Sequence, residues 1–108
     1  MEYRVRANFI LNKLLDFYKA LTDGTVAHQE PDGVEIVSSM RQAKIISPNT
    51  IEWFETCYCP SPLKHERETV YDKYLVNIET ALVEKREKIE GDSFWSFLQN
   101  HCKTHFNE

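Results

Sequence analysis

The apolar and polar positions at the start of the chain predict a strand followed by a helix. Across residues 3–9 every second residue is apolar, and the residues between them include Arg4 and Arg6, which is the period of a half-buried strand. Over residues 11–21 the apolar residues recur at helical spacing instead. Gly24 then suits the position just after a helix C-terminus, so we expect the first helix to end there.

Helical spacing returns after a loop over residues 26–30. Asp32 and Glu35 resemble a capping box, in which two side chains satisfy free backbone N–H groups at a helix N-terminus. Apolar residues follow at helical spacing as far as Ala43. The pattern therefore predicts a short second helix.

A turn signal separates the next two strands. Pro48 and Asn49 suit the second and third positions of a turn, because proline presets φ and asparagine tolerates the left-handed region. The run over residues 51–58 is rich in β-branched and aromatic residues, as strands are. We expect a hairpin, with residues 44–46 entering it.

The chain after this hairpin predicts a helix, a strand and a loop. Ser61 is the expected N-cap of a helix over residues 62–74, with Pro62 in its first position. Residues 76–83 have the composition of another strand, and the charged run over residues 84–90 is most simply a solvated loop.

A final helix is expected after Asp92, which would be its N-cap. Its apolar residues are Phe94, Trp95, Leu98 and Cys102. Without the second and last helices, the order of elements is that of the ferredoxin-like split βαβ fold. We expect one α+β domain over residues 1–108, a two-layer sandwich in which an antiparallel sheet of about four strands carries helices on one face.

Aromatic residues lie on both faces of the strand over residues 51–58. Trp53 falls on one face, and Phe54 and Tyr58 fall on the other. Such a strand is expected to be covered on both faces, the second one by the final helix or by another copy of the chain. We favour a homodimer with a self-complementary interface. The candidate interface residues are Phe54, Tyr58, Trp95 and Phe97.

The composition narrows the classes of partner. The 108 residues have a formal net charge of −4, which argues against a general binder of nucleic-acid backbones. The three glycines form no phosphate-binding loop, and no apolar run is long enough to span a bilayer. The N-terminal residues lack a signal-peptide pattern. We expect a cytoplasmic protein that binds neither nucleic acid nor membrane.

The three cysteines do not have the spacing of a disulfide framework, which fits a reducing compartment. Cys57 and Cys59 share one strand face, so a metal site with His65 can be drawn. The second ligand pair of structural zinc sites is missing, however. We expect no metal and no cofactor, and the simpler interpretation is two small buried side chains.

Cys59 also supports an alternative in which the protein is a small enzyme or redox protein. It lies just before a predicted helix N-terminus, where the helix dipole favours a thiolate. His65 lies early in the same helix and could act as its base. The simpler interpretation is a cysteine at a strand end.

Two arginines, Arg4 and Arg6, project from one face of the first strand, and Arg67 could add a third guanidinium from a helix. Guanidinium groups bind carboxylates and phosphates through paired hydrogen bonds, so these are candidates for binding a small anionic ligand. Equally, they could form ion pairs across the sheet. The leading hypothesis is a homodimeric binding or protein-interaction module. No motif in the chain identifies a reaction.

Overall fold

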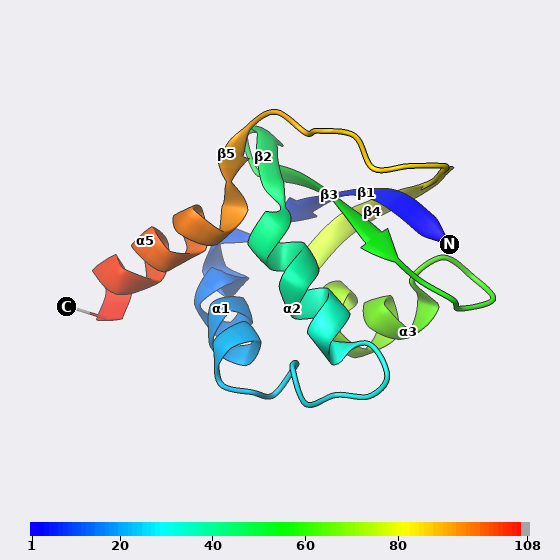
Figure 1. Ribbon diagram of the computed structural model, residues 1–108. Coiled ribbons are helices and arrows are strands. Elements are labelled where there is room, and N and C mark those ends of the chain that lie inside the picture. The colour runs from blue at the N-terminus through cyan, green and yellow to red at the C-terminus, as the bar shows by residue number, and fades with distance from the viewer. Residues whose placement is uncertain (107–108) are drawn as a thin grey trace.

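Five strands form one antiparallel sheet in the computed structural model, which describes residues 1–106 and, of their side chains, those of residues 1–103 (Figure 1). The strands are β1 (Glu2–Phe9), β2 (Lys44–Ser47), β3 (Thr50–Thr56), β4 (Leu75–Val83) and β5 (Asp92–Ser93). Their order is β4-β1-β3-β2-β5, and every neighbouring pair is antiparallel. The predicted α+β class is confirmed. The expected count of about four strands is wrong, because β5 pairs with β2 over two residues only, too few to give a pattern.

The helices pack on one face of this sheet. Three of them are α1 (Leu14–Thr22), α2 (Gly33–Gln42) and α5 (Phe94–Phe106), and the 3-10 turn η1 (Leu11–Lys13) precedes α1. The fourth is a continuous helix made of α3 (Lys64–Glu66), the π-helical turn η2 (Arg67–Tyr71) and α4 (Asp72–Tyr74). No described helix has the length and hydropathy that crossing a lipid bilayer requires.

The core lies between the helices and the sheet face that carries Val5 and Trp53, both buried. Phe17 of α1 stacks on Tyr74 with their ring centroids 4.7 Å apart. Phe94 at the start of α5 is fully buried, and its ring centroid lies 5.5 Å from that of Phe9. Each such side chain contributes about 1.5–3 kcal/mol by leaving water. The final helix therefore covers the same face as the other helices and leaves the outer face to another segment.

Residues 84–91, which we call the connector, cross the outer face of the sheet. They join β4 to β5, which lie at opposite edges of the sheet, so the chain passes over the strands between them (Figure 1). Arg86 attaches the connector: its Nε lies 2.6 Å from Glu2 Oε1, and its Nη2 lies 3.0 Å from Thr56 Oγ1. The charged run is an exposed loop, as expected, but it also covers part of the sheet.

Several local predictions are confirmed, but the N-caps predicted at Ser61 and Asp92 are not. Asn49 adopts positive φ in the hairpin turn, and Gly24 follows the C-cap of α1 with φ of +92°. Ser61 does not cap a helix, because α3 begins at Lys64 after Leu63 has turned through the left-handed region. At the last helix the Ser93 hydroxyl, and not Asp92, accepts the Ser96 N–H at 3.1 Å.

Candidate functional site

A cavity of about 340 Å³ lies between α2, the end of β3 with the loop after it, and α3. We call it the thiol cavity. Its lining residues are Pro31, Asp32, Glu35, Thr56, Cys57, Tyr58, Cys59 and Glu66. Three of these are acidic and two are cysteines, while none is basic. Ligand sites are commonly cavities with a few convergent polar groups, so this is the leading candidate.

Glu66 reaches the cavity because of how the helix after β3 is wound. Glu66 and Tyr71 are five residues apart, which on a regular α-helix would place them about 140° apart. The π-helical turn between them widens the winding, and both side chains are buried on the inner side. Arg67 consequently points outward, where its Nε lies 3.5 Å from Asp72 Oδ1. A π-helical turn inside an α-helix is frequent at functional sites.

The two thiols converge on one carboxylate oxygen. Cys59 Sγ lies 3.4 Å from Glu66 Oε1, and Cys57 Sγ lies 3.8 Å from the same atom. The backbone N–H of Cys59 also donates to Cys57 Sγ at 3.2 Å. All three side-chain atoms lie within 4.8 Å of one another. The expected pair of small buried cysteines is therefore part of a polar cluster.

Glu66 is 2% exposed, and the neighbouring His65 imidazole interacts with its charge without forming an ion pair. Among the described residues, no lysine, arginine or histidine nitrogen forms an ion pair with its carboxylate. Its hydrogen-bond donors are the thiols of Cys57 and Cys59, which are weak donors. A buried carboxylate without a cation is costly, because the interior solvates its charge poorly.

The other two acids of the cavity do have basic partners. Asp32 Oδ2 lies 2.5 Å from His65 Nδ1, and this hydrogen bond raises the pKa of the imidazole. Glu35 accepts the Thr56 N–H at 3.1 Å and lies 3.6 Å from Arg86 Nη2. The position predicted by the capping box is confirmed, because Asp32 is the N-cap residue of α2, but the capping hydrogen bonds are not: both carboxylates form the cavity wall instead.

Cys59 and His65 form no hydrogen bond with each other among the described contacts. The Cys59 thiol faces Glu66, while the imidazole is held by Asp32. Burial raises the pKa of the neighbouring Cys57 thiol to about 12, so this thiol is protonated at neutral pH. The third cysteine, Cys102, is buried far along the chain in α5.

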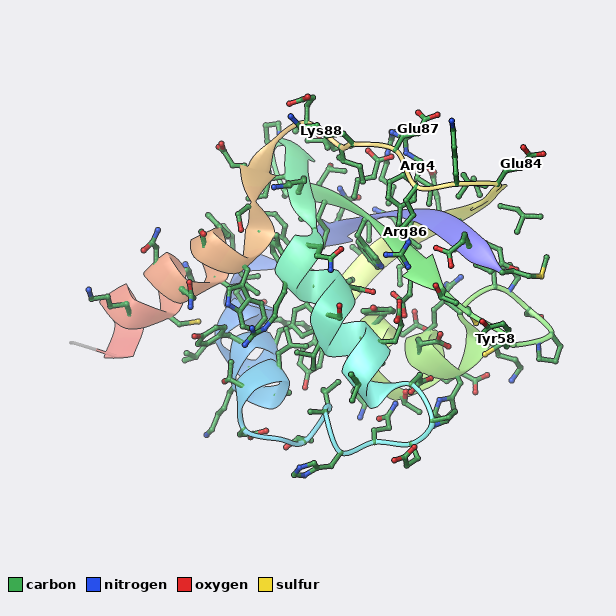
Figure 2. All side chains as sticks on the ribbon, viewed as in Figure 1. Arg4, Tyr58, Glu84, Arg86, Glu87 and Lys88 are labelled. Atoms are coloured by element: carbon green, nitrogen blue, oxygen red, sulfur yellow. The ribbon has the colours of Figure 1, made fainter. Side chains whose placement is uncertain are left out.

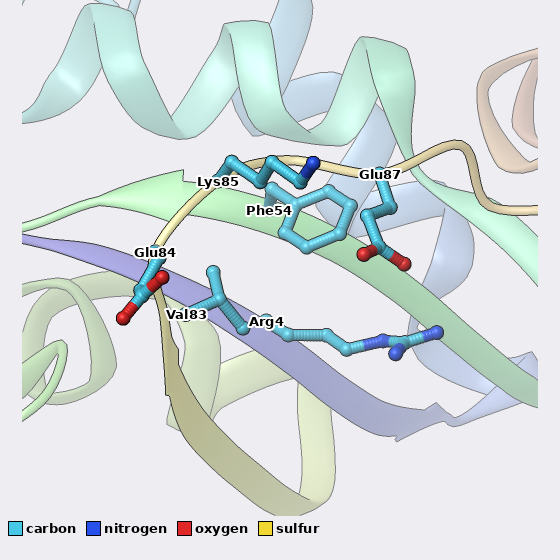
Figure 3. Close-up of a pocket in the computed structure, with 6 residues that line it drawn as sticks. All are labelled: Arg4, Phe54, Val83, Glu84, Lys85 and Glu87. Atoms are coloured by element: carbon cyan, nitrogen blue, oxygen red, sulfur yellow. The ribbon is translucent and has the colours of Figure 1, made fainter.

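The predicted arginine site is divided between the two sides of the sheet. Arg4 and Arg6 lie on the outer face and both approach Glu52 Oε1, as the ion-pair alternative expected. Arg67 lies in the helical layer. Arg4 lines a second cavity of about 310 Å³, between Phe54 and the connector residues Glu84, Lys85 and Glu87 (Figure 3). This cavity has charges of both signs, and Arg4 already has a carboxylate partner.

The four aromatic interface candidates are scattered. Phe54 lies under the connector, with the Arg4 guanidinium carbon 6.0 Å from its ring centroid. Tyr58 is 87% exposed on the loop after β3, at the rim of the thiol cavity (Figure 2). Trp95 and Phe97 are half-buried, and the guanidinium of Arg41 lies 5.0 Å from the Trp95 ring centroid. They do not form one patch.

Glu66, Asp32 and Glu35 were missed as site residues from the sequence. The one available signal was the position of Arg67 within an otherwise apolar helical stripe, which indicates an irregular winding. Comparison of the chain with protein-family models, with curated proteins and with solved structures finds no match. The thiol cavity must therefore be interpreted from its own chemistry.

Proposed function

We propose that this protein is a small binding module that takes a cationic ligand in the thiol cavity. The observation that carries the proposal is Glu66, a buried carboxylate at the cavity wall whose hydrogen-bond donors, among the described side chains, are two thiols. A cation bound beside Glu66 would supply the missing countercharge. The cost of burying this carboxylate would then be offset in the complex.

The charges around the cavity support a cation in preference to an anion. The lining contributes the carboxylates of Asp32, Glu35 and Glu66. Of these, Asp32 forms an ion pair with His65 and Glu35 forms one with Arg86. An anion entering this cavity would meet Glu66 directly, and like charges in a poorly solvated site repel strongly. The volume of about 340 Å³ suits a metal ion with its water or a small organic ammonium ion.

The test is thermal unfolding of the reduced protein with cation probes. We expect ZnCl2 or tetramethylammonium chloride to raise the midpoint relative to NaCl at equal ionic strength, because a ligand that binds only the folded state stabilises it. Glu66→Gln should remove the increase. Glu68→Gln is the matched control, since Glu68 is exposed on the same helix beside Lys64. No shift with any probe, or an equal shift in Glu66→Gln, would refute the proposal.

A thiol-dependent enzyme using Cys59 is the second candidate. It is favoured by the half-buried Cys59 thiol lining the cavity and by the His65 imidazole of α3, which Asp32 at the start of α2 orients. Reactive cysteines lie in electropositive surroundings, however, whereas this thiol faces a carboxylate. The enzyme would require Cys59 to be alkylated much faster than Cys57 and Cys102 at neutral pH.

An anionic ligand at Arg4 and Arg6 has less support. It would compete with Glu52, which both guanidinium groups already approach. The same unfolding assay with sodium sulfate covers this ligand class, with Arg4→Gln as the variant that should abolish any shift.

Three further proposals concern the setting of the module. The pairing of β1 with both β3 and β4, and of β2 with β3, supports a ferredoxin-like core extended by β5 and α5. Free cysteines support a reducing, cytoplasmic compartment. The exposed strand β4 supports a homodimer, because its outer edge pairs with no other strand of the described chain.

A further inference from the structure

We propose that the cation is a thiophilic divalent metal ion of the zinc class, held by Cys57 Sγ, Cys59 Sγ and Glu66 Oε1. This inference rests on the proposed function, because it names the ligand of the same cavity. It goes beyond the sequence, whose C-x-C spacing lacks a second ligand pair. The third ligand comes from a helix that the π-helical turn rotates inward.

The separations of the three atoms fit tetrahedral coordination. With metal–sulfur bonds of about 2.3 Å and metal–oxygen bonds of about 2.0 Å, a sulfur and an oxygen at the tetrahedral angle lie about 3.5 Å apart. The observed distances from Glu66 Oε1 are 3.4 Å to Cys59 Sγ and 3.8 Å to Cys57 Sγ. The three atoms could therefore take up a common ion with small side-chain rotations.

The surroundings of the ligands are also those of a metal site. The Cys59 N–H donates to Cys57 Sγ at 3.2 Å, and such a bond stabilises the charge of a metal-bound thiolate. Cys57 follows β3 directly, and its own N–H bonds to the Met1 carbonyl oxygen at 2.9 Å, which ties its backbone to the start of β1. The positions of the donors are therefore set before an ion arrives, which lowers the entropic cost of binding.

The donor set selects the class of metal. Two sulfurs and one carboxylate suit zinc and related soft ions, whereas calcium and magnesium require six or more oxygen ligands. Three protein ligands leave a fourth position, as in zinc sites that bind water or another ligand. That position would face the cavity, whose wall carries Asp32 and Glu35.

Binding of the metal ion releases protons from the two thiols. Each cysteine binds as a thiolate, so forming two metal–sulfur bonds breaks two S–H bonds and transfers two protons to solvent. Glu66 coordinates the ion through its carboxylate oxygen Oε1. No oxidant or reductant takes part, because the ion and both sulfurs keep their oxidation states.

The experiment is a titration of the reduced, full-length protein with Co²⁺, followed by displacement with Zn²⁺. We expect one equivalent to give a thiolate-to-cobalt charge-transfer band and the intense visible bands of tetrahedral cobalt. Cys57→Ser, Cys59→Ser and Glu66→Gln should each weaken binding by more than about 100-fold, beyond the 10–100-fold loss typical of groups that only support a ligand. Cys102→Ser is the control and should bind as the unsubstituted protein does, because Cys102 is buried in α5 away from the cavity.

The outcomes separate this inference from the proposed function. Absence of the charge-transfer band in the unsubstituted protein overturns the metal site. This result does not depend on whether any of the variants folds. Cobalt binding without that band, or unchanged in Cys57→Ser and Cys59→Ser, overturns it as well. If tetramethylammonium raises the unfolding midpoint while Zn²⁺ does not, the metal site is wrong and the cation-binding module stands. If neither cation acts, both are wrong.

Discussion

Among the described residues, Glu55 is the most deeply buried acid, with 0% of its surface exposed. One carboxyl oxygen accepts hydrogen bonds from Trp53 Nε1 at 2.8 Å and from the Tyr71 hydroxyl at 2.5 Å. The other oxygen has no partner among the described residues. Burial raises the pKa of this carboxyl from 4.5 to about 8, so it is mostly neutral at pH 7.

This pKa predicts a stability that falls with rising pH. Between about pH 5 and pH 8 the folded state keeps the Glu55 proton while the unfolded state has lost it, so unfolding becomes easier as the pH rises. Each pKa unit corresponds to about 1.4 kcal/mol, so the loss amounts to a few kcal/mol by pH 8. Denaturant unfolding of chelator-treated, reduced protein at several pH values measures it.

Glu55→Gln should flatten that dependence, because the amide does not ionise while its oxygen can still accept both hydrogen bonds. The slope with pH is the measurement to compare, since the amide N–H groups also bring a new desolvation cost. Glu68→Gln, an exposed position, should keep the slope of the unsubstituted protein. An unchanged slope in Glu55→Gln would show that another group causes it.

The connector is the segment whose structural role differs most from the role that its sequence predicts. Its residues are mostly charged and exposed, and Figure 2 labels Arg86 among them. Arg86 nevertheless joins the connector to β1, β3 and α2 through Glu2, Thr56 and Glu35. At its other end, Gly91 has φ of +146°, and a Cβ there would lie 2.3 Å from the Ile45 carbonyl oxygen. The connector is thus held at both ends.

Arg86→Ala should release the first of these attachments. We expect cleavage within the connector by a glutamate-specific protease to become several-fold faster, because Glu84, Glu87 and Glu90 then sample open conformations more often. Lys88→Ala is the control: the ion-pair partner of Lys88 is Glu90 within the connector itself, Lys88 is well exposed, and neither substitution removes a cleavage site. Equal rates in the two variants would mean that Arg86 does not anchor the connector.

The continuous helix from Lys64 to Tyr74 links two buried acids. Through Tyr71 it holds Glu55, and through Glu66 it faces the thiols. A regular α-helix could not direct both side chains inward. The hydrogen bond from Tyr71 to Glu55 and the thiol cavity therefore both depend on the π-helical turn.

For the molecule as a whole, the free edge of β4 is where a second copy would add to the sheet. Leu82 on this strand is 59% exposed, and β4 is nine residues long. Long exposed edges with apolar side chains favour pairing between strands of different molecules. We therefore expect light scattering at micromolar concentration to give twice the chain mass of 12.7 kDa.

Leu82→Lys should shift that mass to the monomer, since a charge on the edge opposes pairing. Val34→Lys is the control, because Val34 is 73% exposed on α2, away from the edge. A monomer mass for the unsubstituted protein would exclude the dimer.

The sequence by itself determined most of the elements and their buried faces, although it did not reveal the two-residue strand β5. The alternation around Val5 and the helical spacing around Leu14 arise from the geometry of neighbouring residues, so they can be recognised locally. The left-handed turn residue Asn49 and the terminator Gly24 are local in the same way, because each adopts positive φ. These predictions needed no knowledge of distant contacts.

Tertiary structure alone decided the thiol cavity and the cover of the outer face. Glu66 resembles any surface glutamate in the sequence, and its burial depends on a π-helical turn and on β3 lying beside that helix. The connector crosses the sheet because β4 and β5 are at opposite edges, which follows from strand order. The physical reason is that contacts between residues far apart in the chain decide which charges are buried and which strand a segment lies beside. Such contacts leave no periodic pattern in the sequence.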